Sequence, residues 1–221
     1  MGKLLVLLGL GILVGILSLW RAYSAGKRTR ALAALAAARG FSFAATAAPM
    51  SVIPSGQLNL FRKGDSRRIT NLMWQKTGER LWSHFDLTYV SGYKDHETRE
   101  QTQTVTMFQT SQVNFPGFQL AAKDLIDKIS RIFDGPNIHF ESSPHFSNSY
   151  LLKGKDEPAI RALFDENTVL YFETHPGYSV EAFGDALIVY HAGQLLKLQD
   201  TEREMMNRDE IFQLLANNAK K

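Results

Sequence analysis

Residues 68–90 have the sequence RITNLMWQKTGERLWSHFDLTYV, and residues 98–111 have the sequence TREQTQTVTMFQTS. β-branched and aromatic side chains are frequent in three runs of this stretch, 68–75, 79–90 and 98–111, which short polar segments separate. Such runs are typical of strands joined by hairpins. The stretch therefore predicts an antiparallel meander of three strands. Neither face of 98–111 is strongly apolar at its start, so we expect this third strand to be partly exposed or near a sheet edge.

Further helices and strands are predicted on both sides of the meander. Alanine and leucine over residues 28–39 favour a helix that Gly40 closes, and a short strand should follow at 41–43. Pro116 is expected to end the β region, and apolar residues from Phe118 to about Phe133 recur at the spacing of an amphipathic helix.

The C-terminal part alternates short predicted strands and helices. Gly184-Asp185 is typical of a two-residue hairpin loop, and Thr201-Glu202-Arg203-Glu204 has the pattern of a capping box that opens a final helix. The remaining expected elements are strands at 137–141 and 149–153, a helix at 156–164, and the hairpin strands at 178–183 and 186–191. Residues 167–174 fit either a strand or a short helix, and the short helix is favoured.

These elements predict an α+β fold, in which one N-terminal transmembrane helix precedes an antiparallel β-sheet domain with amphipathic helices packed on it. We divide the chain into an anchor at 1–25, a basic juxtamembrane helix and connection at 26–56, and a soluble domain at 57–221. The soluble domain is either one unit or two halves, 57–134 and 135–221.

The anchor is predicted from residues 4–20, LLVLLGLGILVGILSLW, which carry no charge. As a helix they span roughly 25 Å, close to the ~30 Å of a bilayer's hydrocarbon core. Residues suited to the membrane interface follow them: Trp20, Arg21, Tyr23, Lys27, Arg28 and Arg30. A cleaved signal peptide with its site at 22–24 is disfavoured, because a bulky and cationic segment surrounds that site. Myristoylation at Gly2 is disfavoured because Val6 replaces the preferred hydroxyl residue.

Flanking charges orient the anchor. Four cations closely follow the apolar segment, whereas Lys3 and the amino terminus precede it. The positive-inside rule then predicts a single-pass protein of the cell inner (plasma) membrane with a cytoplasmic C-terminal domain. Gly11, Gly15 and Ser18 share one helix face, which makes them candidates for helix pairing. The expected partners are the lipid bilayer and either another membrane protein or a second copy.

The net charge of +3 does not indicate a nucleic-acid-binding protein. Eight basic residues precede the first acidic residue, Asp65, whereas the remainder contains 17 basic and 22 acidic residues. A nucleic-acid binder concentrates cations on its folded face. The excess positive charge lies instead in the segment beside the predicted membrane, where each cation contributes about 1 kcal/mol of attraction to anionic lipid. We therefore expect no nucleic-acid partner.

No catalytic or cofactor motif is recognisable in the chain. It contains no cysteine, which excludes disulfides, thiolate metal sites and thiol catalysis. His139, Glu141 and His145 are the candidate metal ligands, but their spacing matches no established pattern, and surface side chains are the favoured interpretation. We therefore expect no bound metal and no cofactor, and catalytic residues stay unknown. Asp86 lies within an aromatic strand, and if it is buried it requires a partner such as an arginine.

Several short strings in the chain carry a resemblance: 38–43 (ARGFSF), 60–64 (LFRKG), 103–105 (QTV) and 181–190 (EAFGDALIVY). In this order the chain resembles an uncharacterised family of membrane-anchored bacterial proteins of about this size. The resemblance implies a bacterial inner-membrane protein and brings no activity, cofactor or catalytic residue with it. The leading hypothesis is a non-catalytic, membrane-tethered binding or scaffolding protein. The alternative is a membrane-tethered hydrolase-type enzyme, assisted by a metal at His139, Glu141 and His145.

Overall fold

The structure is a computed structural model of the 221-residue chain, and it describes residues 23–47, 58–62, 64–91, 99–124 and 135–220. The predicted anchor at 4–20 and the helix-pairing candidates Gly11, Gly15 and Ser18 lie outside these ranges. Within them, no helix combines the length and the apolar character needed to cross a membrane.

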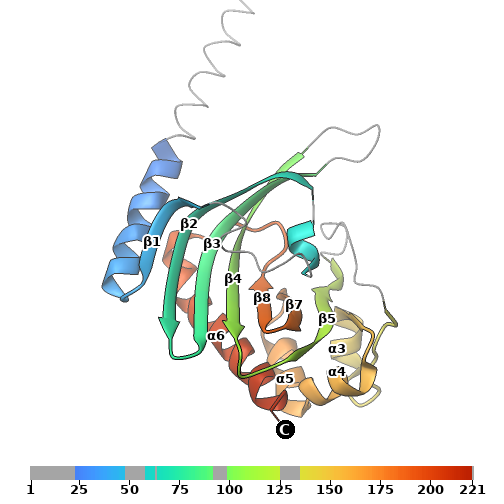
Figure 1. Cartoon of the computed structure of the whole chain (residues 1–221). Coiled ribbons are helices and arrows are strands. Elements are labelled where there is room, and N and C mark those ends of the chain that lie inside the picture. The colour runs from blue at the N-terminus through green and yellow to red at the C-terminus, as the bar shows by residue number, and fades with distance from the viewer. Residues whose placement is uncertain (1–22, 48–57, 63, 92–98, 125–134, 221) are drawn as a thin grey trace, which may run out of the picture.

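Eight strands of the described residues form one antiparallel sheet in the order β1-β2-β3-β4-β8-β7-β5-β6 (Figure 1). Its first four strands are β1 (Ser42–Ala47), β2 (Asp65–Thr77), β3 (Arg80–Ser91) and β4 (Arg99–Thr110). The other four are β5 (Phe115–Ala122), β6 (Tyr150–Gly154), β7 (Ser179–Gly184) and β8 (Ala186–Tyr190). The α+β fold and the predicted meander are confirmed, because β2, β3 and β4 pair in sequence.

Helices cover one face of this sheet. A helix spans residues 23–38, and the others are α3 (Pro144–Ser149), α4 (Glu157–Leu163), α5 (Glu166–Thr174) and α6 (Thr201–Asn218). In Figure 1 the helix at 23–38 lies beside β1, and α6 runs behind the central strands. The opposite face is partly covered by a short 3₁₀ helix, η1 (Asn59–Arg62), whose Phe61 ring stacks on Phe85 with centroids 6.3 Å apart.

Alternation along β3 assigns its side chains to these two faces. Trp82, His84 and Asp86 point toward the helices, whereas Phe85 and Leu87 point toward η1, because successive side chains of a strand leave opposite faces. Both sets are largely buried. The part of the sheet around Phe85 and Asp86 therefore has a packed layer on each side.

Several predicted elements of the C-terminal part are confirmed. Asp156 caps α4 through its side chain, which accepts a hydrogen bond from the Ala159 amide at 3.1 Å, and α5 follows as expected. Phe183 pairs with Ala186, so Gly184 and Asp185 form the predicted two-residue loop. Gly184 has a φ of +61°, a conformation that favours glycine.

The predicted helix from Phe118 is wrong over the residues that the structure describes. Residues 115–122 form β5, which lies between β7 and β6, and residues 125–134 lie outside the described ranges. Pro116 is accommodated inside this strand because the register with β7 shifts between Phe115 and Phe118, and a proline within a sheet is tolerated at such an irregularity.

Two smaller predictions are also wrong. Residues 137–141 do not form a strand, and only Asn137 makes an isolated bridge, to Lys153. Thr201 is not the N-cap of α6, because the 3₁₀ turn η3 (Leu198–Asp200) leads directly into the helix and Thr201 already has helical dihedral angles. Its hydroxyl donates back to the Lys197 carbonyl oxygen at 3.2 Å.

Of the two alternatives predicted for 98–111, partial exposure is confirmed at the start of the strand, where Arg99 and Glu100 are exposed, but a position at the sheet edge is wrong. β4 lies between β3 and β8, and its Gln103, Thr104 and Thr106 are at most 1% exposed. These polar side chains are tolerated there because each takes part in a hydrogen bond with a neighbouring element. That pattern defines the candidate site.

Candidate functional site

The helix at 23–38 is joined to the sheet by a buried ion pair. Arg28 donates from Nε to Asp86 Oδ2 at 2.7 Å and from Nη2 to Asp86 Oδ1 at 2.8 Å. The side chains of Arg28 and Asp86 are 12% and 3% exposed. This two-pronged geometry is the strongest form of an arginine–carboxylate contact. Arg28 is thus the partner that a buried Asp86 requires, although the two residues lie 58 positions apart.

Asp86 has further partners on the neighbouring strands. Asn71 Nδ2 of β2 and Thr104 Oγ1 of β4 each donate to it at 2.8 Å. Asn71 lies at a register shift of β2 and has a φ of +53°, and its side-chain oxygen accepts a bond from Thr29 Oγ1 at 2.8 Å. An irregularity of this kind changes the direction of a side chain, and here it directs Asn71 toward Asp86. The carboxylate is therefore saturated with donors, so its role here is structural.

A second buried polar centre lies under α6. Arg208 is 0% exposed, and its Nη1 donates to the Thr104 carbonyl at 3.1 Å and to Thr106 Oγ1 at 3.3 Å. Burial lowers the pKa of this guanidinium to about 10, although Glu204, with its Oε2 at 3.9 Å from Arg208 Nε, opposes that shift. The side chain thus stays charged near neutral pH and connects α6 to the backbone of β4.

His84 lies beside this arginine. Its Nδ1 is 2.9 Å from Thr106 Oγ1. Burial, assisted by the charge of Arg208, lowers the pKa of His84 to about 3, so the imidazole is neutral near pH 7. Within the described residues, His84 Nε2 and Arg208 Nε and Nη2 are buried without a hydrogen-bond partner. Buried donors and acceptors without a partner cost free energy, so this centre is less well satisfied than the Asp86 carboxylate.

The polar centre reaches the surface through Glu204. Its Oε2 accepts from Tyr178 Oη at 3.1 Å and lies 3.2 Å from His191 Nε2, and His191 Nδ1 lies 2.9 Å from the Gly177 carbonyl. Burial alone would raise the pKa of Glu204, but the His191 hydrogen bond and the Arg208 charge outweigh burial, and the net shift is downward. Burial raises the pKa of Tyr178 to about 12. Near neutral pH, Glu204 is therefore ionised and Tyr178 is protonated.

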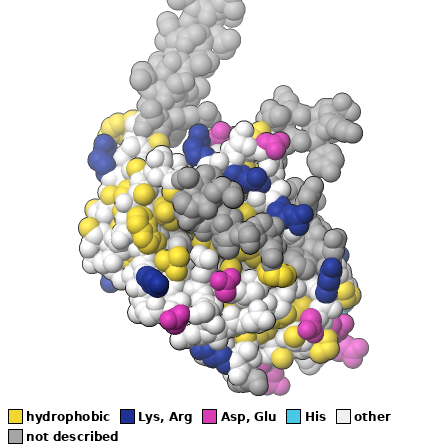
Figure 2. All heavy atoms as spheres, viewed as in Figure 1, with side chains coloured by type: hydrophobic (Ala, Val, Ile, Leu, Met, Phe, Trp, Pro, Cys, Tyr) yellow, Lys and Arg dark blue, Asp and Glu magenta, His cyan; other side chains and the backbone are white. Residues whose placement is uncertain are grey.

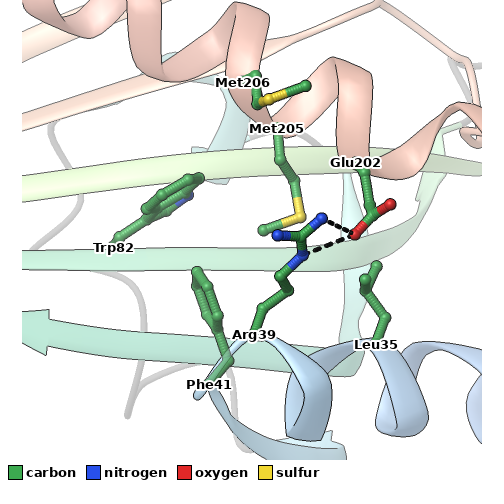
Figure 3. Close-up of a pocket in the computed structure, with 7 residues that line it drawn as sticks. All are labelled: Leu35, Arg39, Phe41, Trp82, Glu202, Met205 and Met206. Atoms are coloured by element: carbon green, nitrogen blue, oxygen red, sulfur yellow. Dashed lines mark hydrogen bonds and ion pairs between the residues drawn. The ribbon is translucent and has the colours of Figure 1, made fainter.

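A pocket of about 210 Å³ lies between the helix at 23–38 and α6 (Figure 3). Met205 and Met206 come from α6, Trp82 comes from β3, and the exposed ion pair of Arg39 with Glu202 joins the two helices across it at 2.7 Å. Leu35 and Phe41 complete its wall. The two helices therefore meet through apolar contacts as well as through the buried charges.

The three candidate metal ligands of the sequence do not converge. His139, Glu141 and His145 are all exposed. His139 Nε2 contacts Asn137 Nδ2 at 2.7 Å, whereas His145 Nδ1 lies 3.9 Å from Glu173 Oε1. Across the described ranges, no group of three or more His, Asp or Glu side chains is arranged to hold a metal ion.

The membrane-interface residues of the sequence fall partly within the described chain. Tyr23, Lys27 and Arg30 are exposed on the helix at 23–38, while Arg28 turns into the ion pair with Asp86. Trp20 and Arg21 lie outside the described ranges.

The sequence did not identify the centre around Arg208 and His84. One signal for it exists, because Thr102, Thr104 and Thr106 alternate along one face of β4 opposite Thr88, Asp86 and His84 of β3. A row of hydroxyls facing ionisable side chains is equally consistent with a buried, hydrogen-bonded face and with a face exposed to solvent. The choice between the two depends on α6, which lies about a hundred residues later in the chain.

No family model and no curated protein matches the chain. Among solved structures, the chain is similar in fold to the mycobacterial trehalose monomycolate transport factor A, TtfA, with a TM-score of 0.59 and 10% sequence identity. The similarity covers 86% of this chain and 93% of that protein's chain. At this level of identity the comparison shows a shared fold, and the fold extends over almost the whole of both chains.

Proposed function

We propose that this chain is a single-pass, membrane-tethered scaffolding protein that presents its α+β domain to a transport assembly at the bacterial inner membrane. The observation that carries the proposal is the buried Arg28–Asp86 ion pair. It fixes the helix that would continue from the predicted anchor onto the central strands of the sheet. A domain joined to its tether in this way keeps one orientation to the membrane, whereas a flexible linker would leave it free to rotate.

Apolar packing supports the same junction. Leu32 and Ala36 of the helix are each 1% exposed, and they pack with Met73 of β2 and Met205 of α6. The helix at 23–38 is therefore part of the domain's core, and its exposed face carries Lys27 and Arg30, which suit an anionic lipid surface. The lipid bilayer is one proposed partner, and another membrane protein or a second copy is the other.

The likeness to TtfA favours a transport assembly over other membrane settings. The name of that protein assigns it to the transport of trehalose monomycolate, and the shared fold covers 93% of its chain. We carry over only the class of role, a factor in transport.

Tethering and orientation can be tested with single cysteines, because the chain contains none of its own. We expect the full-length protein to sediment with membranes and a variant lacking residues 1–22 to lose that association. With a cytoplasmic domain, an exposed Lys155→Cys site should react with a membrane-impermeant maleimide in inside-out vesicles and stay unlabelled in intact spheroplasts. Labelling in intact spheroplasts would reverse the proposed orientation.

The scaffolding role can be tested by purification of the full-length protein in mild detergent, with identification of the proteins that accompany it. Arg28→Gln should leave membrane association intact and reduce partner recovery, because the helix is no longer fixed to Asp86. Arg30→Gln changes an exposed cation on the same helix and should leave recovery unchanged. Equal recovery from both variants, or substrate turnover by the purified protein, would contradict the proposal.

A further inference from the structure

An apolar groove lies on the face of the sheet opposite the helices. It has a volume of about 460 Å³ and is lined by Ala44, Ala47, Leu72, Trp74, Lys76, Leu81 and Ser83. These residues share a face because Leu72 pairs with Ala44, Trp74 with Ser83, and Lys76 with Leu81 across β1, β2 and β3. Figure 2 shows hydrophobic side chains gathered over this part of the molecule.

The volume of the groove suits one long aliphatic chain. An apolar cavity of about 150 Å³ holds a benzene molecule, so by proportion about 460 Å³ holds an apolar chain of roughly 18 carbons. Trp74 and Leu81 are only half-buried in the described structure. Apolar side chains that remain in contact with water along a continuous hollow are typical of a binding site.

One end of the groove carries a positive charge. Lys76 is exposed there, and it forms neither an ion pair nor a hydrogen bond with any residue in the described part of the chain. The nearby charged side chains have partners of their own, since Glu79 accepts from Ser111 Oγ at 2.7 Å and Arg80 donates to Asp209 Oδ1 at 2.8 Å. The groove therefore combines an apolar channel with one available cation, which complements an amphiphile with a single chain and an anionic head.

We propose that this groove binds a long-chain fatty acid, with the chain along Leu72, Trp74 and Leu81 and the carboxylate at Lys76. The site lies wholly within β1–β3, so it does not depend on the membrane tether or on the scaffolding role proposed above.

The proposal is tested with the full-length protein in phosphatidylcholine nanodiscs and a fatty acid that carries a photoreactive diazirine in its chain. After irradiation, we expect mass spectrometry to locate the label in the segment 69–83. Lys76→Glu should weaken labelling about fivefold, because it replaces attraction for the carboxylate by repulsion. Ala44→Phe should abolish labelling by filling the groove. Lys155→Glu, the same charge change at an exposed lysine elsewhere, should have no effect.

Competition by unlabelled fatty acids gives a second measurement. Affinity should rise about fourfold with each added methylene, the factor that corresponds to burial of one such group, and should level off near 18 carbons. Labelling that is confined to residues 1–25 or to the pocket between the helix at 23–38 and α6 overturns the proposal. Labelling that is unchanged in both Lys76→Glu and Ala44→Phe also overturns it. So does crosslinking between two copies that Ala44→Phe abolishes, because a second copy would then occupy the groove.

Discussion

The two halves of the helix-covered face hold their helices by different means. Over β2, β3 and β4, the helix at 23–38 and α6 meet the sheet through apolar contacts and, in addition, through Arg28, Asp86, Arg208 and surrounding hydroxyls. Over β5 and β6, the helices α3, α4 and α5 meet it through aromatic rings, with Phe118 edge-on to Phe164 at 5.4 Å and Phe146 stacked on Tyr150 at 5.3 Å. We call these regions the polar half and the aromatic half.

The difference shows how each half specifies its packing. Aromatic rings gain free energy in many arrangements, because apolar burial has no direction. A bidentate arginine–carboxylate pair accepts one orientation, so the polar half fixes the direction of the helix at 23–38 as well as its position. A protein that must hold its tether in one orientation benefits from charge at that helix and can rely on apolar packing elsewhere.

Among the variants that test this comparison, Asp86→Ala should reduce the free energy of unfolding most. It leaves the buried guanidinium of Arg28 without a counter-charge and removes the acceptor of Asn71 and Thr104. We expect a loss of roughly 4 kcal/mol in the free energy of unfolding, measured by denaturant titration of the full-length protein in detergent micelles. Hydrogen exchange should accelerate across residues 23–38 and stay slow in α3–α5.

The control for Asp86→Ala is Glu202→Ala. Glu202 also pairs with an arginine, Arg39, which directly follows the helix at 23–38, but Arg39 and Glu202 are 63% and 50% exposed. This variant should cost less than about 1 kcal/mol. A similar loss in the two variants would show that burial of the charges does not distinguish the polar half.

Phe172→Ala should have the next largest effect, in the aromatic half. The ring is 0% exposed and lies within 6.4 Å, between centroids, of Phe146, Phe164 and Tyr150. Truncation creates a cavity and should cost roughly 3 kcal/mol by the same titration. Amide hydrogen exchange should accelerate in α3–α5 and stay slow at 23–38. This pattern is the reverse of the one expected for Asp86→Ala. Acceleration over both regions would mean that the two halves unfold as one unit.

The two halves also differ in how far the sequence predicts them. Local signals located α4 and the β7–β8 hairpin, because a cap at Asp156 and a loop glycine at Gly184 act over a few residues. The sequence also implied that a buried Asp86 needs an arginine, but it could not select Arg28 among the many arginines of the chain. That choice depends on a contact across 58 positions, which no local pattern encodes.

The errors have the same origin. The threonines of β4 suggested a position near the sheet edge, because the sequence does not reveal that Arg28 and Arg208 supply their partners. In β5, Phe118, Leu120 and Ala122 alternate as in a strand, while Phe118, Ala122 and Leu125 also fit helical spacing. The sheet decides between the two patterns, since β5 pairs with both β6 and β7.

Lowering the pH should also destabilise the polar half, by less than the Phe172→Ala substitution destabilises the aromatic half. The pKa of His84 is lowered to about 3, below its ordinary value of 6.5. Between these pH values the His84 imidazole is protonated in the unfolded chain and neutral in the folded protein. Folding stability therefore falls as the pH drops from 6.5 toward 3. His84 alone should contribute a loss of roughly 2–3 kcal/mol between about pH 7 and about pH 4.5.

The variant His84→Gln isolates this contribution, because glutamine does not titrate. Its free energy of unfolding should depend less steeply on pH over that interval than that of the parent, by about one proton. The variant Phe172→Ala should retain the parent's slope, since no ionisable group is altered in the aromatic half. Parallel pH profiles for the parent and His84→Gln would show that the imidazole is accessible to protons in the folded protein.

Tyr178→Phe should have the smallest effect, at the surface end of the polar half. The change removes the hydroxyl that donates to Glu204 and accepts from Asn207 Nδ2, and we expect a loss of about 1 kcal/mol near pH 7. The Tyr178 bond is one of the contacts that lower the pKa of Glu204, so its contribution is present above the ordinary pKa of that carboxyl and is lost as the pH falls. The difference between the variant and the parent should therefore shrink on acidification, which denaturant titrations at several pH values will measure. A difference that stays constant would place Tyr178 outside the charge network, as an apolar contact whose hydroxyl adds nothing to Glu204.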